Sequence, residues 1–158
     1  MKRLVVTADD FGAAREVNEA FELAHTRGIL TATSLMVAAP AAAEAVALAK
    51  RLPSLRVGLH VVLVEGRPIL PPSQIPDLVD ANGMFRTNMA ASGAAMFFFS
   101  EVRRQLEHEI EAQFEAFRAT GLTLDHVNAH KHFHLHPTIA STILRIGKKH
   151  GMRALRVP

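Results

Sequence analysis

The sequence predicts an α/β fold in which helices alternate with parallel strands. Short apolar runs rich in β-branched residues alternate with longer segments whose apolar residues recur at helical spacing. Such alternation forms parallel sheets through right-handed crossovers. Polar residues suited to catalysis follow several of the apolar runs, as expected for a site at the carboxyl ends of strands. We assign residues 1–158 to a single domain, because the length suits one domain and no linker or repeat is visible.

The first part of the chain contains three predicted strands separated by two predicted helices. The strands cover residues 3–8, 32–38 and 56–63, and the helices cover 13–28 and 41–51. In the first helix, apolar residues recur at i, i+3, i+4 and i+7 from Val17, and Gly28 stands where a helix C-cap is expected. These elements form the beginning of a parallel sheet covered by helices.

A long segment rich in Pro, Gly and Asn interrupts this alternation between residues 65 and 99. Segments of this length in a compact domain are usually functional or mobile, and short helices can form within them. The elements predicted after it are a helix over 101–120, a strand over 122–129, a helix over 137–150 and a fifth strand from residue 152. Ser100 is predicted to cap the first of these helices, and Pro137 to open the second.

Candidate metal ligands stand at the ends of three predicted strands. Asp9 and Asp10 follow the first strand, and His60 lies at the end of the third. The run HVNAHKHFHLH, with five histidines among its eleven residues (126–136), begins as the fourth strand ends. Carboxylate oxygen and imidazole nitrogen suit zinc or another first-row divalent ion, and a set of one carboxylate and two histidines leaves positions open for water and substrate. Since adjacent carboxylates face opposite ways in an extended chain, one can bind metal while the other does proton chemistry.

Each of these signals has an ordinary structural alternative. An Asp pair at a strand end often forms a turn or a helix N-cap, and His60 alone is compatible with a buried, hydrogen-bonded histidine. If the fourth strand continues, His130, His132, His134 and His136 share one face, although geometry prevents all four from binding one ion. The coincidence at three strand ends favours a metal site. No role is assigned to the histidines on predicted helices, which are His25, His108 and His150.

Composition excludes several classes of protein. With no cysteine, the chain has no disulfides, thiolate metal sites or cysteine nucleophiles. No apolar run is long enough to cross a bilayer, and the first apolar stretch is too short for a signal peptide, so we expect a cytoplasmic protein. Basic residues gather near the end, at Arg145, Lys148, Lys149, Arg153 and Arg156. We interpret them as a solvated helix face, with peripheral contact to anionic lipid as the alternative; nucleic acid is not expected, because no aromatic residues are interleaved with them.

Three motifs in this order resemble the YdjC/ChbG-like carbohydrate deacetylases: TADDFG at 7–12, GLHVVLVEGRP at 58–68 and DHVNAHKHFHLHP at 125–137. The resemblance runs along essentially the whole chain. The stretch IPDLVDANGMF at 75–85 and the histidine run are most similar to the hopanoid-biosynthesis-associated members, which are implicated in removing an acetyl group from an N-acetylglucosaminyl hopanoid. The family implies a distorted TIM-like (β/α) barrel and one divalent metal ion, magnesium or zinc.

The resemblance also implies roles for individual residues. The metal ligands correspond to Asp10, His60 and His130, and Asp9 corresponds to the general base. His132 and His134 match further histidines of the site, and either could protonate the leaving amine. Family members are longer and carry another histidine motif near their C-terminus, which is an equally good candidate for that acid.

By comparison with the family, the chain is expected to be a C-terminally truncated form, because about five βα units cannot close a barrel of eight. We expect such a form to self-associate through its open sheet edge and to have weak activity. The predicted function is metal-dependent removal of an N-acetyl group from an acetylated amino sugar, such as an N-acetylglucosaminyl hopanoid or a chitooligosaccharide-like glycan. One alternative is a metal-dependent phosphoesterase, for which only Lys131 and Arg67 lie near the motifs as phosphate ligands. Another is a non-catalytic metal- or sugar-binding fragment.

Overall fold

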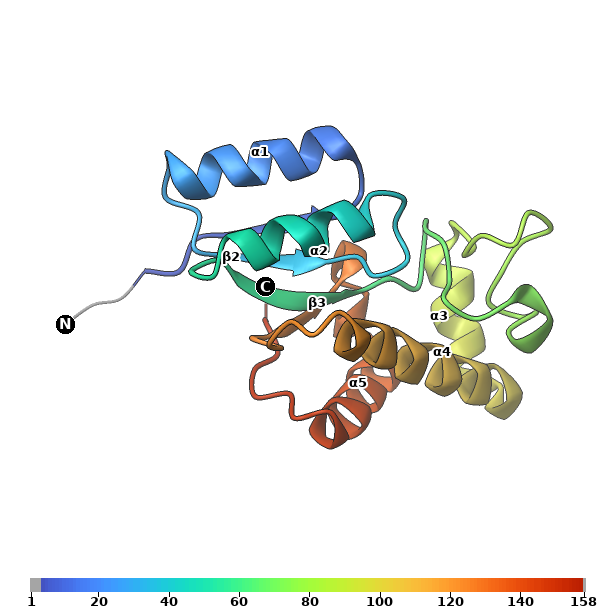
Figure 1. Ribbon diagram of the computed structural model, residues 1–158. Coiled ribbons are helices and arrows are strands. Elements are labelled where there is room, and N and C mark those ends of the chain that lie inside the picture. The colour runs from blue at the N-terminus through green and yellow to red at the C-terminus, as the bar shows by residue number, and fades with distance from the viewer. Residues whose placement is uncertain (1–3, 158) are drawn as a thin grey trace.

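The computed structural model describes residues 4–157 and shows a parallel sheet with helices on both faces (Figure 1). Its strands are β1 (Thr7–Phe11), β2 (Ala32–Leu35), β3 (Arg56–Val61) and β4 (Val127–Ala129). They lie in the sheet in the order of the sequence, and each neighbouring pair is parallel. The predicted α/β fold with parallel strands is therefore confirmed. Because the strands are parallel, their carboxyl ends meet at a single edge of the sheet.

The helices form a layer on each side of the sheet (Figure 1). One layer contains α1 (Arg15–Thr26) and α2 (Ala42–Arg51), and the other contains α4 (Ser100–Ala119) and α5 (Pro137–Lys149), with α3 (Met89–Phe98) packed beside α4. Sheets covered on both faces have strands buried in continuous runs, and every residue of β2 is buried accordingly. Within residues 4–157, no helix combines the length and the apolar character needed to span a membrane.

Helix α4 carries both the core of its layer and a row of buried polar side chains. Its buried apolar residues recur every three or four positions and face the sheet; they are Val102, Leu106, Ile110, Phe114 and Phe117. The buried polar side chains are Gln105, Glu109 and Gln113. Burying a polar group without a hydrogen-bond partner costs free energy, so each of these three side chains is expected to have partners.

Those partners belong to the segment that follows β3. The Glu109 carboxylate accepts hydrogen bonds from the backbone N–H groups of Ile69 and Leu70, at 2.9 and 3.0 Å. Gln113 bonds both backbone groups of Val62, and Gln105 accepts from the N–H of Asp77. The Pro-rich segment is therefore attached to α4 along its length, and it contains a short 3₁₀ turn (Pro72–Gln74) as well as α3.

Two predicted boundaries are wrong at the start of elements. The first strand begins at Thr7, and Leu4 and Val5, which were predicted to belong to it, are 80% and 65% exposed; residue 3 lies outside the described residues. Pairing with the next segment begins only at Val6, whose carbonyl accepts from the N–H groups of residues 31 and 32. Ser100 does not cap α4 but is its first residue, and no side chain caps this helix at Phe99.

The later strands are shorter than predicted. The fourth strand includes only Val127–Ala129, and the predicted fifth strand is reduced to one parallel bridge between Leu155 and Val127. Two backbone hydrogen bonds flank this bridge, from Val127 N–H to Ala154 and from Arg156 N–H to Val127. The segment around Leu155 thus lies beside β4 at the position expected for a fifth strand, and it brings Arg156 to the sheet.

Candidate metal centre

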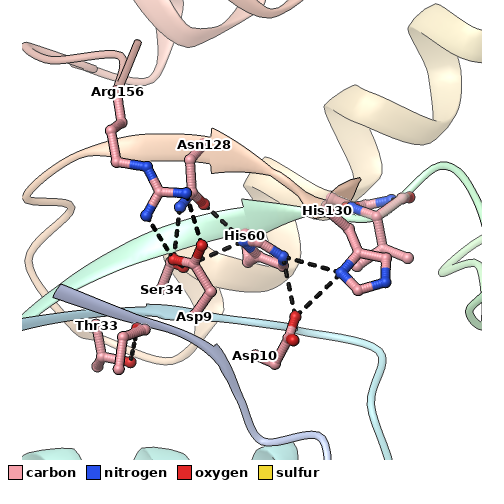
Figure 2. Close-up of polar contacts among 11 residues, drawn as sticks. Asp9, Asp10, Thr33, Ser34, His60, Asn128, His130 and Arg156 are labelled. Atoms are coloured by element: carbon pink, nitrogen blue, oxygen red, sulfur yellow. Dashed lines mark hydrogen bonds and ion pairs between the residues drawn. The ribbon is translucent and has the colours of Figure 1, made fainter. Parts of the chain in front are cut away.

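Asp10, His60 and His130 meet at the carboxyl edge of the sheet (Figure 2). Asp10 comes from β1, His60 from β3, and His130 follows β4 directly. The Oδ1 atom of Asp10 lies 3.1 Å from Nε2 of His60 and 3.0 Å from Nδ1 of His130, and these two nitrogens are 3.2 Å apart. These three residues come from motifs that lie up to 120 positions apart in the sequence, and the fold brings them together.

The spacing of these three atoms fits a single divalent ion. Metal–ligand bonds of about 2.0–2.2 Å, at the angles of tetrahedral or octahedral sites, place neighbouring ligand atoms roughly 2.8–3.6 Å apart. The observed separations of 3.0–3.2 Å lie within that range. The hydrogen bond from His130, together with the neighbouring ring of His60, holds the pKa of Asp10 well below its usual range. The carboxylate is therefore ionised at neutral pH, which is the form that binds a cation.

Asp9 and Asp10 are the third and fourth residues of β1, and not residues that follow the strand as predicted. Asp10 has a left-handed backbone (φ 68°), and the pairing of β1 with β2 changes register between Ala8 and Phe11. Such an irregularity re-aims side chains. The two carboxylates point to different partners, as expected from the sequence: Asp10 faces the two histidines, and Asp9 faces Ser34, Asn128 and Arg156 (Figure 2).

The histidine run does not continue as a strand, so its histidines do not share one face. It forms a 3₁₀ segment (His130–Leu135) that includes two residues with positive φ. His132 is exposed, while His134 is buried with its Nε2 2.9 Å from the carbonyl oxygen of Arg156. Burial lowers the pKa of His134. Within the described residues, no hydrogen bond or ion pair joins His132 or His134 to the three candidate ligands.

All four non-glycine residues with positive φ between residues 4 and 157 belong to the segments around this edge. They are Asp10, Glu65, Lys131 and His132. A left-handed backbone is uncommon for residues other than glycine, and such conformations gather at functional sites. The Lys131 ammonium pairs with the Glu65 carboxylate, which links the segment after β3 to the segment after β4. The backbone conformation thus marks the same edge as the candidate ligands.

Asp9 is the centre of a polar network beside the candidate ligands (Figure 2). Its Oδ1 accepts hydrogen bonds from Ser34 Oγ and Asn128 Nδ2, each at 2.9 Å, and from Arg156 Nη1 at 2.7 Å. Its Oδ2 accepts from Arg156 Nη2 at 2.6 Å. Burial raises the pKa of Asp9, but the hydrogen bonds from Arg156 and Ser34 outweigh burial and hold it below its usual value.

Ser34, Asn128 and Arg156 were not predicted as site residues from the sequence. The interpretation of Arg156 as part of a solvated helix face is wrong, because its guanidinium pairs with Asp9 and its side chain is only 24% exposed. Ser34 and Asn128 are polar residues inside predicted buried strands, which is the one signal that could have indicated them. Their partners lie on other strands, so local pattern alone does not reveal the network.

Residues 3–158 match the model of a family described as YdjC-like protein. The chain belongs to this family. The resemblance predicted from three short motifs is confirmed at the level of the family, whereas the hopanoid-associated subgroup stays a prediction.

Relatives within the family include enzymes named carbohydrate deacetylase. One from Brevibacillus brevis is 37% identical over 148 residues, and one from Vibrio cholerae is 38% identical over 151 residues; both alignments cover 94% of this chain and 56% of the relative. The crystal structure of a candidate cellobiose-phosphate cleavage protein from Enterococcus faecalis V583 aligns with a TM-score of 0.81 at 28% identity, covering 95% of this chain and 57% of that one. The chain therefore spans just over half the length of these relatives.

A cavity of about 280 Å³ opens at the same edge of the sheet. It is lined by segments that follow β1, β2 and β3, and most of its walls are apolar, with Met36, Val37, Pro40 and Val62 among them. Arg67 supplies a charged group at this cavity. A larger hollow of about 660 Å³ lies at the opposite, amino end of the strands. Ligand sites of parallel sheets lie at carboxyl ends, so we take the smaller cavity as the one related to function.

A second group of residues with metal-binding chemistry lies away from the sheet edge, between α4 and α5. It consists of Glu111, Glu115 and His150. The Nε2 atom of His150 is 2.6 Å from Glu111 and 3.8 Å from Glu115, and its ring stacks on Phe114. A hydrogen bond between Glu111 of α4 and His150, the residue that follows α5, together with the stacking on Phe114, accounts for these contacts.

Proposed function

We propose that this chain is a metal-dependent carbohydrate deacetylase that removes an N-acetyl group from an acetylated amino sugar. The observation that carries the proposal is the convergence of Asp10, His60 and His130 at ligand spacing, in a member of a family whose relatives are named carbohydrate deacetylases. Asp10, His60 and His130 would hold the ion. When bound, a divalent ion supplies a Lewis acid for the acetyl carbonyl.

Asp9 is the proposed general base. Its Oδ1 already accepts from Ser34, Asn128 and Arg156, whereas Oδ2 accepts only from Arg156 among the described residues. Oδ2 therefore retains capacity to take a proton from the attacking water. The lowered pKa of Asp9 keeps this carboxylate ionised throughout the neutral range.

The two remaining catalytic candidates differ in their surroundings. His134 is buried and engaged with the Arg156 carbonyl oxygen, and its lowered pKa makes it a neutral group at neutral pH. His132 is exposed at the same segment and free to turn toward a substrate. We therefore propose His132 as the donor of a proton to the leaving amine, with His134 supporting the segment that carries Arg156.

The ligand set supports zinc, or another first-row divalent ion, over magnesium. Magnesium prefers oxygen ligands and retains several waters, whereas two imidazole nitrogens with one carboxylate are typical of catalytic zinc. For the substrate we propose an amino sugar carried by a glycan or by a hopanoid. A part of the substrate other than the scissile amide would occupy the apolar cavity. The phosphoesterase alternative is less well supported, because Lys131 pairs with Glu65 and leaves Arg67 as the remaining phosphate ligand.

The test is acetate release from N-acetylglucosamine oligosaccharides and from an N-acetylglucosaminyl lipid, with and without chelator. We expect chelator-sensitive release that is lost when alanine replaces Asp10, His60 or His130. His108→Ala is the matched control, because His108 is an exposed histidine of α4. Metal binding without acetate release from any substrate would instead support a binding module, and release of phosphate would support a phosphoesterase.

We also propose that the chain self-associates. β1 is the outer strand on one side of the sheet, and the neighbouring Leu4 and Val5 are largely exposed. Unpaired edge strands with apolar side chains favour pairing with another chain. Light scattering should report a dimer or larger assembly, and Val5→Lys should shift it toward the monomer. A monomer at high concentration in the unmodified protein contradicts this part of the proposal.

A further inference from the structure

Asn128 lies between Asp9 and His60 and is completely buried (Figure 2). Its Nδ2 is 2.9 Å from Asp9 Oδ1, and its Oδ1 is 2.7 Å from His60 Nδ1. Ser34 makes a parallel connection, because its hydroxyl oxygen is 2.9 Å from Asp9 Oδ1 and 3.1 Å from His60 Nδ1. Two buried side chains thus join the Asp9 carboxylate to the ring of a candidate metal ligand.

The Asp9 carboxylate determines which way this amide faces. A carboxylate paired with the guanidinium of Arg156 is an acceptor only, so it requires a donor from Asn128. The NH₂ group of Asn128 must therefore face Asp9, and its carbonyl oxygen must face His60. The single hydroxyl proton of Ser34 also goes to Asp9, which leaves an oxygen lone pair facing the ring of His60.

His60 Nδ1 thus meets two acceptors, and a neutral imidazole satisfies them only by carrying its proton on that nitrogen. Nε2 is then unprotonated. This is the nitrogen that faces Asp10 Oδ1 and His130 Nδ1 at 3.1 and 3.2 Å. The competing tautomer carries the proton on Nε2 and donates it toward Asp10, which would occupy the lone pair that a metal ion needs.

We infer that Asn128 is a positioning residue that fixes His60 in the Nδ1–H tautomer and so keeps its Nε2 available as a metal ligand. The inference rests on the proposed metal site. It adds a role for a residue that contacts neither the ion nor the substrate. Partners of this kind commonly change metal affinity 10–100-fold when they are removed.

The test combines two measurements on the same proteins. In metal-free protein with ¹⁵N-labelled histidine at mildly alkaline pH, the long-range ¹H–¹⁵N spectrum of His60 reports which ring nitrogen carries the proton. Titration with Zn²⁺ then reports affinity. Asn128→Leu removes the nearer of the two acceptors, at 2.7 Å against 3.1 Å for Ser34, with similar side-chain volume, and Thr33→Val is the matched control. Thr33 is the buried neighbour of Ser34 in β2, and its hydroxyl donates to the Ala8 carbonyl instead.

We expect His60 to be an Nδ1–H tautomer in the unmodified protein and in Thr33→Val, and to shift to Nε2–H in Asn128→Leu, with Zn²⁺ affinity about 10–100-fold lower. An Nε2–H tautomer in the unmodified protein would overturn the inference, as would an unchanged tautomer and affinity in Asn128→Leu. If Asn128→Leu does not fold, Asn128→Ala, which introduces no extra volume, carries the same comparison. An unmodified protein that shows the Nδ1–H tautomer but binds no Zn²⁺ contradicts the proposed function and not the tautomer assignment.

Discussion

Arg156→Met should destabilise the fold, whereas Arg153→Met should have almost no effect. Both arginines belong to the basic group near the end of the chain, but only Arg156 reaches Asp9. The substitution keeps much of the apolar stem and removes two charge-assisted hydrogen bonds of 2.7 and 2.6 Å. Arg153 is exposed and has no ion pair within the described residues. The pair is therefore a matched comparison of a network residue with a surface residue.

The expected loss for Arg156→Met is about 2–3 kcal/mol in the free energy of unfolding. Removing one partner of a buried ion pair costs about 3–5 kcal/mol, because the other charge is left without compensation. We expect a smaller loss than for a fully buried pair, because the Arg156 and Asp9 side chains are 24% and 29% exposed and Asp9 retains its hydrogen bonds from Ser34 and Asn128. Arg153→Met should change the free energy by less than about 0.5 kcal/mol.

The loss of stability caused by Arg156→Met should be smaller at acidic pH than at neutral pH. The folded-state pKa of Asp9 lies below the usual value of 3.8. The stability that this shift contributes is therefore present above pH 3.8 and lost as pH falls through the folded pKa. Urea unfolding of both variants at neutral and at acidic pH measures this. Equal effects of the two substitutions at neutral pH, or a cost for Arg156→Met that grows on acidification, would refute the assigned pairing.

Two further predictions concern the general base and the attachment of the segment after β3 to α4. Asp9→Asn should keep the bound metal but lower the rate of acetate release about 10²–10⁴-fold, because an amide cannot take the proton from water; a wild-type rate would remove Asp9 from the chemistry. Glu109→Gln should lower the free energy of unfolding by about 1–3 kcal/mol in urea melts, because one of the buried N–H groups of Ile69 and Leu70 then faces a donor. Glu101→Gln, on the exposed side of α4, is its control, and similar effects of the two would contradict the role assigned to Glu109.

Sequence periodicity was sufficient for the fold class, and it indicated which strand ends carry the candidate ligands. The strand–helix alternation implies parallel strands, and parallel strands bring their carboxyl ends together. Position and residue type therefore indicated the Asp9–Asp10 pair, His60 and the histidine run, and the family resemblance selected Asp10 and His130 among them. Their mutual distances of 3.0–3.2 Å follow from the order and register of β1, β3 and β4, which periodicity does not specify.

The errors arose where backbone conformation or long-range pairing overrides local pattern. The alternating histidines indicated a continued strand, but Lys131 and His132 adopt a left-handed backbone, and the alternation ends there. The apolar run at residues 3–8 indicated a buried strand, yet pairing begins only where Val6 meets the segment before β2. Arg156 resembled its basic neighbours in sequence, and only the bridge between Leu155 and Val127 brings it to Asp9.

The central claim is that one metal ion binds between Asp10, His60 and His130, and anomalous diffraction at the zinc edge tests it most directly. Crystals grown with Zn²⁺ should show one strong peak at about 2.0–2.2 Å from Asp10 Oδ1, His60 Nε2 and His130 Nδ1. The peak should disappear in His60→Ala. The absence of a peak at this edge, or a peak only at Glu111, Glu115 and His150, would contradict the account.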